Sequence, residues 1–132
     1  MTSLLGKRSS MVLFHNEIGH QSHKVRIVLS EKGITADLEA LDPENLPKEI
    51  LEVNPKGFLP LLIDRELALY KSQLIVEYLD ERFPHPPLLP VYPVARAQTR
   101  LILHRIEEEW TYHVDILELS LIHISEPTRP RL

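Results

Sequence analysis

Apolar residues recur along the first third of the chain at two spacings, one typical of strands and one typical of helices. Residues 11–14 form an uninterrupted apolar run, as expected of a strand covered on both faces. Ser22 is a candidate N-cap for a following helix, and Gly33 is a candidate left-handed end for it. Residues 36–41 alternate apolar and acidic side chains, which predicts a half-exposed strand. The helix between the two strands has an apolar stripe of Val25, Val28 and Leu29.

The next segment predicts a short helix, a hairpin and a longer helix. Residues 46–53 permit a helix that ends before Asn54. Pro60 stands at the first residue of an apolar strand, although proline cannot donate to a strand ladder. A cis Leu59-Pro60 bond would explain that position and would turn the Leu59 backbone outward to bind an extended peptide. A strand over residues 66–70 completes an antiparallel hairpin. The helix that follows has an apolar stripe of Leu74, Ile75, Tyr78 and Leu79.

In chain order these segments give strand, helix, strand, helix, two strands and a helix. A helix joins the first two strands, so they should run parallel, and the hairpin should add an antiparallel edge. We expect one α/β domain of this kind over residues 9–83.

A proline-rich segment then separates this domain from a second helical region. Residues 84–90 predict a stiff linker, because prolines fix the backbone and prevent regular structure. A long helix begins near Val94, with an apolar stripe of Leu103, Ile106, Trp110, Val114 and Leu117. One helix cannot bury such a stripe by itself. We therefore expect residues 91–118 to be the start of an all-α domain whose further helices the chain does not supply.

Composition narrows the possible functions. The net charge of −4 disfavours nonspecific nucleic-acid binding, which requires a basic surface. With no cysteine, the chain has no disulfide, zinc-thiolate site or Cys-x-x-Cys redox centre. Neither a signal peptide nor an apolar run of membrane-spanning length is found, so we expect a cytoplasmic protein with no membrane contact.

Two motifs make the chain resemble a known family. Residues 24–33 and residues 77–96, the second containing the run Phe-Pro-His-Pro-Pro, are similar to stringent starvation protein A, a bacterial family of the glutathione S-transferase superfamily. The similarity extends over about residues 7–118. It implies an α/β fold, namely a thioredoxin-like glutathione S-transferase N-terminal domain with the first helix of an incomplete all-α C-terminal domain.

The resemblance implies a regulator of transcription. Stringent starvation protein A associates with RNA polymerase during nutrient stress, and it lacks glutathione-conjugating activity. A homodimer is expected when the protein is full length, without direct nucleic-acid binding. The alternatives are an active glutathione S-transferase and a nonfunctional fragment.

Thiol-conjugating transferases place a Tyr, Ser or Cys near the start of the first helix to stabilise the thiolate. Alignment on the residue 24–33 motif puts Gly19 at that position, and glycine has no side chain to donate. His20 and Gln21 beside it offer no hydroxyl, and Ser22 is more typical of a helix cap. No catalytic residue is therefore predicted, and no cofactor is expected, although glutathione binding stays open.

Four residues are similar to the glutathione site of the superfamily: Leu59, Pro60, Lys71 and Ser72. Leu59 and Pro60 form the predicted peptide-binding edge. Ser72 could bind an anion with its hydroxyl and the helix N-terminal amides, or it could simply cap the helix. Lys71 stands where the family usually has an acidic residue. A lysine cannot bind the ammonium of glutathione, although it could attract a carboxylate.

The residues Pro84, His85, Pro86 and Pro87 are predicted to form a partner-binding loop. A rigid proline-rich surface loses little entropy when it docks. Composition alone favours a linker, and the family resemblance favours the docking surface. For His20 and His23 we expect surface histidines and no metal site, because no cysteine or third ligand is near.

The last residues have a separate interpretation. Residues 119–130 resemble the translation of an adapter used in sequencing libraries, and the hypothesis is that residues 119–132 are a non-native tail on a truncated chain. The nucleotide sequence would test this, because codons that do not spell the adapter would exclude it. We assign no function to His123 or to the residues after it.

Overall fold

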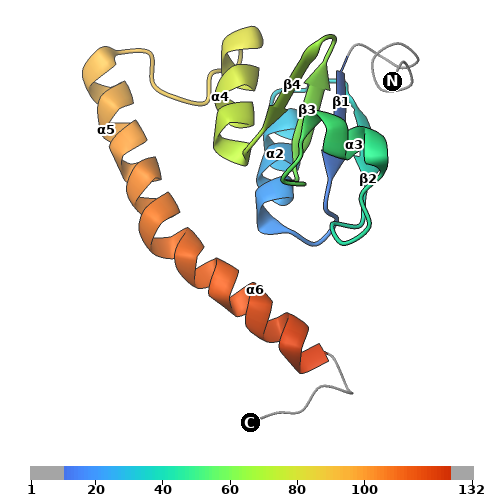
Figure 1. The fold of residues 1–132 in the computed structure, drawn as a ribbon. Helices are drawn as coiled ribbons and strands as arrows, with labels where there is room; N and C mark the ends of the chain where they lie inside the picture. The colour runs from blue at the N-terminus through green and yellow to red at the C-terminus, as the bar shows by residue number, and fades with distance from the viewer. Residues whose placement is uncertain (1–10, 126–132) are drawn as a thin grey trace. The chain divides into compact units, whose positions relative to one another are not determined.

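The computed structural model describes residues 11–125 of the chain, with side chains described for residues 11–121. A four-stranded sheet lies at its centre (Figure 1). The strands are β1 (Met11–His15), β2 (Asp37–Ala40), β3 (Leu61–Asp64) and β4 (Leu67–Tyr70), in the order β2-β1-β3-β4. The β1–β2 pair is parallel, and the β1–β3 and β3–β4 pairs are antiparallel. The predicted thioredoxin-like topology is confirmed.

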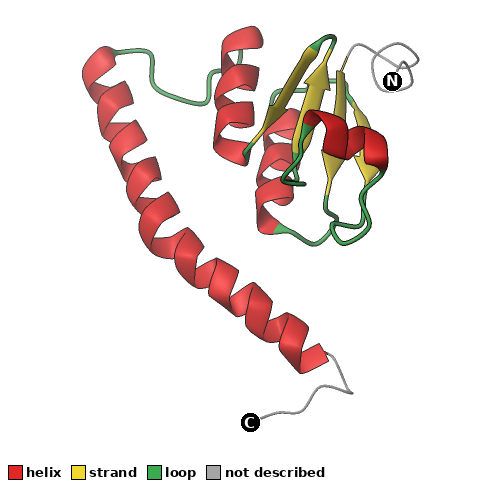
Figure 2. Cartoon of the chain, in the orientation of Figure 1, coloured by secondary structure: helices red, strands yellow, loops and turns green. Residues whose placement is uncertain are grey.

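Helices cover both faces of the sheet (Figure 2). Alternate residues of β1 enter two separate cores, which explains the uninterrupted apolar run. Met11 and Leu13 pack with the helices α2 (His20–Glu31) and α4 (Ser72–Arg82). Val12 and Phe14 pack on the other face with Ile50 of α3 (Lys48–Val53).

The backbone conformations predicted at Gly33 and Pro60 are confirmed. Gly33 follows the C-cap of α2 with φ of +63°, the left-handed conformation that glycine adopts without a Cβ clash. The Leu59-Pro60 bond is cis, and Pro60 is buried immediately before β3. The Asp64-Arg65 turn joins β3 to β4, with Arg65 at φ of +59°.

Three details of the predicted elements were wrong. Helix α2 begins at His20 with Gly19 as its N-cap, so Ser22 is not the cap. Leu74 is 48% exposed, because α4 buries the narrower stripe of Ser72, Ile75 and Leu79. In β2 the apolar Leu38 is 51% exposed, whereas Asp37 and Glu39 are half-buried, the reverse of the usual pattern for an alternating strand.

The second region is one helical run that we describe by itself. The chain divides into two compact units between Pro87 and Leu88, inside the proline-rich segment. The run consists of α5 (Pro93–Arg105), the π-helical η1 (Ile106–Trp110) and α6 (Thr111–Ser125). Proline at the first helical position suits the start of α5, since that N–H has no partner within the helix.

Neither α5 nor η1 has a buried residue. In the predicted stripe Ile106 is half-buried, and the other members are exposed: Leu103, Trp110, Val114 and Leu117. Residues 119–125 of the predicted tail continue α6, and residues 126–132 lie outside the described residues. Within the described part of the chain, no helix is both long and apolar enough to span a membrane.

Candidate functional site

Three segments named by the sequence meet at one end of the sheet. Strand register pairs Phe14 with Leu61, and Leu61 with Tyr70. The loop after β1, the start of β3 and the end of β4 therefore lie side by side. This arrangement brings the Gly19 loop, Pro60 and Lys71 to the same end, which we call the glycine end.

A tight turn and a buried amide shape the loop before Pro60. Asn54 is fully buried, and its Nδ2 donates to the carbonyl of Phe58 over 2.6 Å. The Gly57 N–H donates to the Asn54 carbonyl, and Gly57 has φ of +68°. A Cβ there would also lie 2.9 Å from Leu46 Cδ1, so this turn strongly favours glycine. The ring of Phe58 packs 5.6 Å from that of Tyr70, which fixes the loop against β4.

The predicted nucleophile position has no room for a side chain without local adjustment. A Cβ on Gly19 would lie 3.0 Å from Nδ2 of Asn16. The Oδ1 of Asn16 accepts the Ile18 N–H at 3.2 Å, so this amide side chain is used within the loop. Glycine therefore fits the local packing as well as lacking a donor.

The serine beside it is turned inward. Ser22 is 1% exposed, and its Oγ accepts the N–H of Asn16 at 3.0 Å. The hydroxyl therefore fastens the loop to α2, which explains why Ser22 lies inside the helix and does not cap it.

Ser72 is also engaged within the protein. It is the first residue of α4, 6% exposed, and its hydroxyl donates to Oε1 of Gln21. No side-chain cap bond is formed, so the predicted cap role is wrong. Lys71 precedes it as an exposed residue with φ of +77°. The Ser72–Gln21 hydrogen bond therefore links the start of α4 to the start of α2. The role of Lys71 and Ser72 in binding glutathione stays a prediction.

Sequence reasoning did not assign a role to His15 and Arg26, which stabilise this end. Nη1 of Arg26 donates to Nδ1 of His15 at 2.8 Å and to the Asn16 carbonyl at 3.1 Å, and Nη2 donates to the Glu17 carbonyl at 3.2 Å. Burial and the Arg26 charge lower the pKa of His15, against an opposing effect of Glu17. A His at the end of a buried strand and an Arg eleven residues later were the available signals.

The opposite end of the sheet carries buried charges, and we call it the charged end. Asp64 ends β3 and accepts hydrogen bonds from the Tyr78 hydroxyl and, at 2.8 Å, from Arg82 Nε. Burial and the Asp64 contact raise the pKa of Tyr78. Arg82 also lies over the Phe83 ring at 4.8 Å. The exposed residues Pro84 to Pro87 follow directly, so the predicted partner-binding loop leaves the domain at this end.

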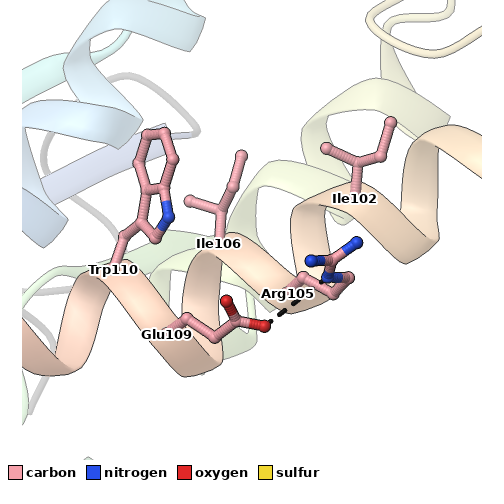
Figure 3. Close-up of a pocket in the computed structure, with 5 residues that line it drawn as sticks. All are labelled: Ile102, Arg105, Ile106, Glu109 and Trp110. Atoms are coloured by element: carbon pink, nitrogen blue, oxygen red, sulfur yellow. Dashed lines mark hydrogen bonds and ion pairs between the residues drawn. The ribbon is translucent and has the colours of Figure 1, made fainter.

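A shallow hollow of about 250 Å³ lies on the side of the helical run (Figure 3). Its lining residues are Ile102, Arg105, Ile106, Glu109 and Trp110. Arg105 pairs with Glu109 at 3.5 Å, and of the apolar lining residues Ile102 and Trp110 are exposed and Ile106 is half-buried. A groove formed by one exposed helix does not enclose a ligand.

Comparison with known proteins agrees with this geometry. The family model for the glutathione S-transferase N-terminal domain matches residues 13–87. The chain belongs to the glutathione S-transferase superfamily. It is 54% identical to a stringent starvation protein A homolog of Pasteurella multocida, over 83% of this chain and 52% of that protein. A stringent starvation protein A homolog of Haemophilus ducreyi is 51% identical, over 89% of this chain and 55% of that protein.

These matches confirm the resemblance to stringent starvation protein A. The chain spans about half the length of these curated relatives. Among solved structures, the glutathione transferase Omega 3C of Trametes versicolor superposes with a TM-score of 0.74 at 26% identity, covering 82% of this chain and 47% of that chain. The transferase-type fold is therefore confirmed.

Proposed function

We propose that this chain belongs to an RNA polymerase-associated transcription regulator of the stringent starvation type, without glutathione-conjugating activity. The proposal rests on the burial and hydrogen bonding of two serines. Ser22 lies near the nucleophile position, and Ser72 lies where the superfamily binds one end of glutathione. Both are buried and hydrogen-bonded within the protein. Gly19, the N-cap of α2, has no side chain, so these positions present no exposed hydroxyl to a thiol.

The partner-binding loop supports the regulatory half of the proposal. Pro84, His85, Pro86 and Pro87 are all exposed, on a backbone that three prolines restrict. A surface that is already ordered loses less conformational entropy on docking than a flexible one. We propose RNA polymerase as the partner, with the intact protein acting as a cytoplasmic homodimer and without direct contact to nucleic acid.

The loop is tested by replacing Pro84, His85 and Pro86 with alanine and measuring binding to purified RNA polymerase. We expect binding to weaken about tenfold or more, as hot-spot truncations of about 2 kcal/mol do. The matched control is Pro43→Ala with Pro55→Ala, two exposed prolines away from the loop. Unchanged binding by a folded triple variant would remove the loop from the proposal. The same variants in a full-length relative would report on polymerase-dependent transcription.

An active glutathione S-transferase is the second candidate. It is favoured by the glycine end itself, because the cis Leu59-Pro60 edge and Lys71-Ser72 lie together as in a peptide-binding site. Retention on glutathione-agarose and a conjugation assay distinguish the two. Retention without conjugation would leave a binding site but no enzyme, and conjugation above the uncatalysed rate would favour the transferase.

A further inference from the structure

The side chain of Lys32 is completely buried at the C-terminal end of α2. It is 0% exposed, and the residue is the C-cap of the helix, directly before Gly33. Lysine is almost never fully buried unless its ammonium is paired, because removing that charge from water is costly. The position therefore calls for a specific set of partners.

The Lys32 ammonium has three partners within reach. Its Nζ donates to the carbonyl of Phe83 over 2.5 Å and to the carbonyl of Pro86 over 2.7 Å, and it pairs with Oδ1 of Asp80 at 2.8 Å. An ammonium has three N–H donors, so these three acceptors saturate it. Phe83 is the C-cap of α4, where carbonyls lack partners within the helix.

The prolines restrict the backbone angles within the loop, but they do not attach the loop to the rest of the domain. Residues 84–87 lie outside any helix or strand, and the side chains are exposed. Pro84, Pro86 and Pro87 carry no N–H, so they cannot donate to a neighbouring strand or turn. Apart from the His85 N–H, carbonyl oxygens are the backbone groups left to anchor the segment. The ammonium binds the carbonyl of Phe83, directly before the loop, and that of Pro86, within it. Hydrogen bonds from a charged donor are about twice as strong as neutral ones.

We propose that Lys32 is a positioning residue that holds the loop from Pro84 to Pro87 in one conformation, as a preformed docking surface. Its role as a surface for RNA polymerase rests on the proposed function above. The anchoring itself does not depend on the identity of the partner. The two parts are therefore tested separately.

The decisive variant is Lys32→Met with Asp80→Leu. Removing Lys32 alone would take the ammonium away from the Asp80 carboxylate, which is 10% exposed, whereas an apolar pair of similar volume is often tolerated in place of a buried ion pair. The double variant therefore preserves packing between α2 and α4 while both carbonyls lose their donor. The control is Lys48→Met, an exposed lysine of α3.

Nuclear magnetic resonance relaxation of the His85 amide measures the anchoring. We expect an order parameter of about 0.85 in the wild type and in the control, and below about 0.6 in the double variant. Sheet amides and the unfolding temperature should stay close to the wild-type values. An unchanged His85 order parameter in the folded double variant would overturn the proposal.

The wild-type protein provides a test that needs no variant. The Lys32 ammonium should give a resolved, slowly exchanging nitrogen signal with couplings across the hydrogen bonds to the Phe83 and Pro86 carbonyl carbons. A signal averaged with solvent, without these couplings, would overturn the anchoring even if the double variant failed to fold.

Binding to purified RNA polymerase connects the anchor to the function. If the docking conformation falls to about a tenth of the ensemble, the apparent Kd rises about tenfold. A loosened loop with unchanged polymerase affinity would refute the docking role. A loosened loop in a protein whose wild type does not bind polymerase would contradict the proposed function and leave the anchoring supported.

Discussion

The two ends of the sheet use polar groups in different ways. At the glycine end, Ser22, Ser72 and Asn54 form neutral hydrogen bonds within a transferase-like site. The charged Arg26 there donates to neutral acceptors and not to a carboxylate. At the charged end, Lys32–Asp80 and Asp64–Arg82 are ion pairs with one or both partners buried, next to an exposed loop. Interactions with buried charges are stronger and cost more to break than neutral hydrogen bonds. The comparison indicates that the interactions hardest to replace lie at the charged end, where the loop leaves the domain. Those at the glycine end, where a thiol would react, should cost less to break.

The largest loss of stability should come from breaking the Lys32–Asp80 ion pair. Lys32→Met removes the Lys32 ammonium from the Asp80 carboxylate, which is 10% exposed. We expect a loss of about 3–5 kcal/mol in the free energy of unfolding, as measured by urea denaturation. Lys48→Met should change it by less than about 0.5 kcal/mol. Equal losses in the two variants would show that the Lys32–Asp80 pair contributes no more to stability than an exposed lysine does.

The second largest loss of stability is expected at Tyr78, whose hydroxyl donates to the buried Asp64 carboxylate. Tyr78→Phe removes one hydrogen bond to a charged acceptor and little volume. We expect a loss of about 1.5–3 kcal/mol. Tyr92→Phe, at a residue 78% exposed, is the matched control and should be nearly neutral. A neutral result for Tyr78→Phe would mean that Arg82 alone satisfies Asp64.

A smaller loss is expected at the glycine end. Ser72→Ala removes one neutral donor to Gln21, and the typical cost is about 1 kcal/mol. Ser30→Ala, on the exposed side of α2, serves as the control. If Ser72→Ala cost more than Lys32→Met, the contrast between the two ends would be reversed.

The smallest expected effect is a pH dependence of the stability that arises from His15. Its pKa is lower in the folded protein than the usual 6.5, so the unfolded chain binds the proton more readily. Above about pH 7 the residue is neutral in both states and contributes no pH dependence. Below the unfolded pKa, protonation of the unfolded chain reduces the stability, and the loss grows as the pH falls toward the folded pKa.

His15→Asn removes this titration and retains an acceptor for Arg26. The stability of the wild type relative to this variant should be constant above about pH 7 and should decline toward about pH 5.5. Urea denaturation at several pH values measures it. A difference that does not vary with pH would show that His15 titrates alike in both states.

The sequence predicted those features that depend on local chemistry. The apolar run at Met11–Phe14, the left-handed Gly33 and the proline before β3 each follow from one segment alone. The parallel pairing of β1 and β2 followed from the helix that joins them. The family motifs also singled out Gly19, Pro60 and Lys71, and in the structure these residues lie at one end of the sheet.

Features that depend on distant partners were not predictable. Ser22 and Ser72 have the residue type and position of caps, yet Asn16 and Gln21 determine what their hydroxyls bind. Lys32 before Gly33 is typical of a solvated helix end. Its burial depends on carbonyls more than fifty residues away, which no local pattern encodes.

The most direct test of the central claim is the ionisation of glutathione in the presence of this protein. Ultraviolet difference absorbance reports the thiolate as glutathione is added near neutral pH, below the ordinary thiol pKa of about 8.5. We predict no more thiolate than free glutathione gives, since Gly19 and the inward-turned serines provide no donor to stabilise it. A thiolate signal that appears well below that pKa, and that Ser22→Ala or Ser72→Ala abolishes, would contradict the account.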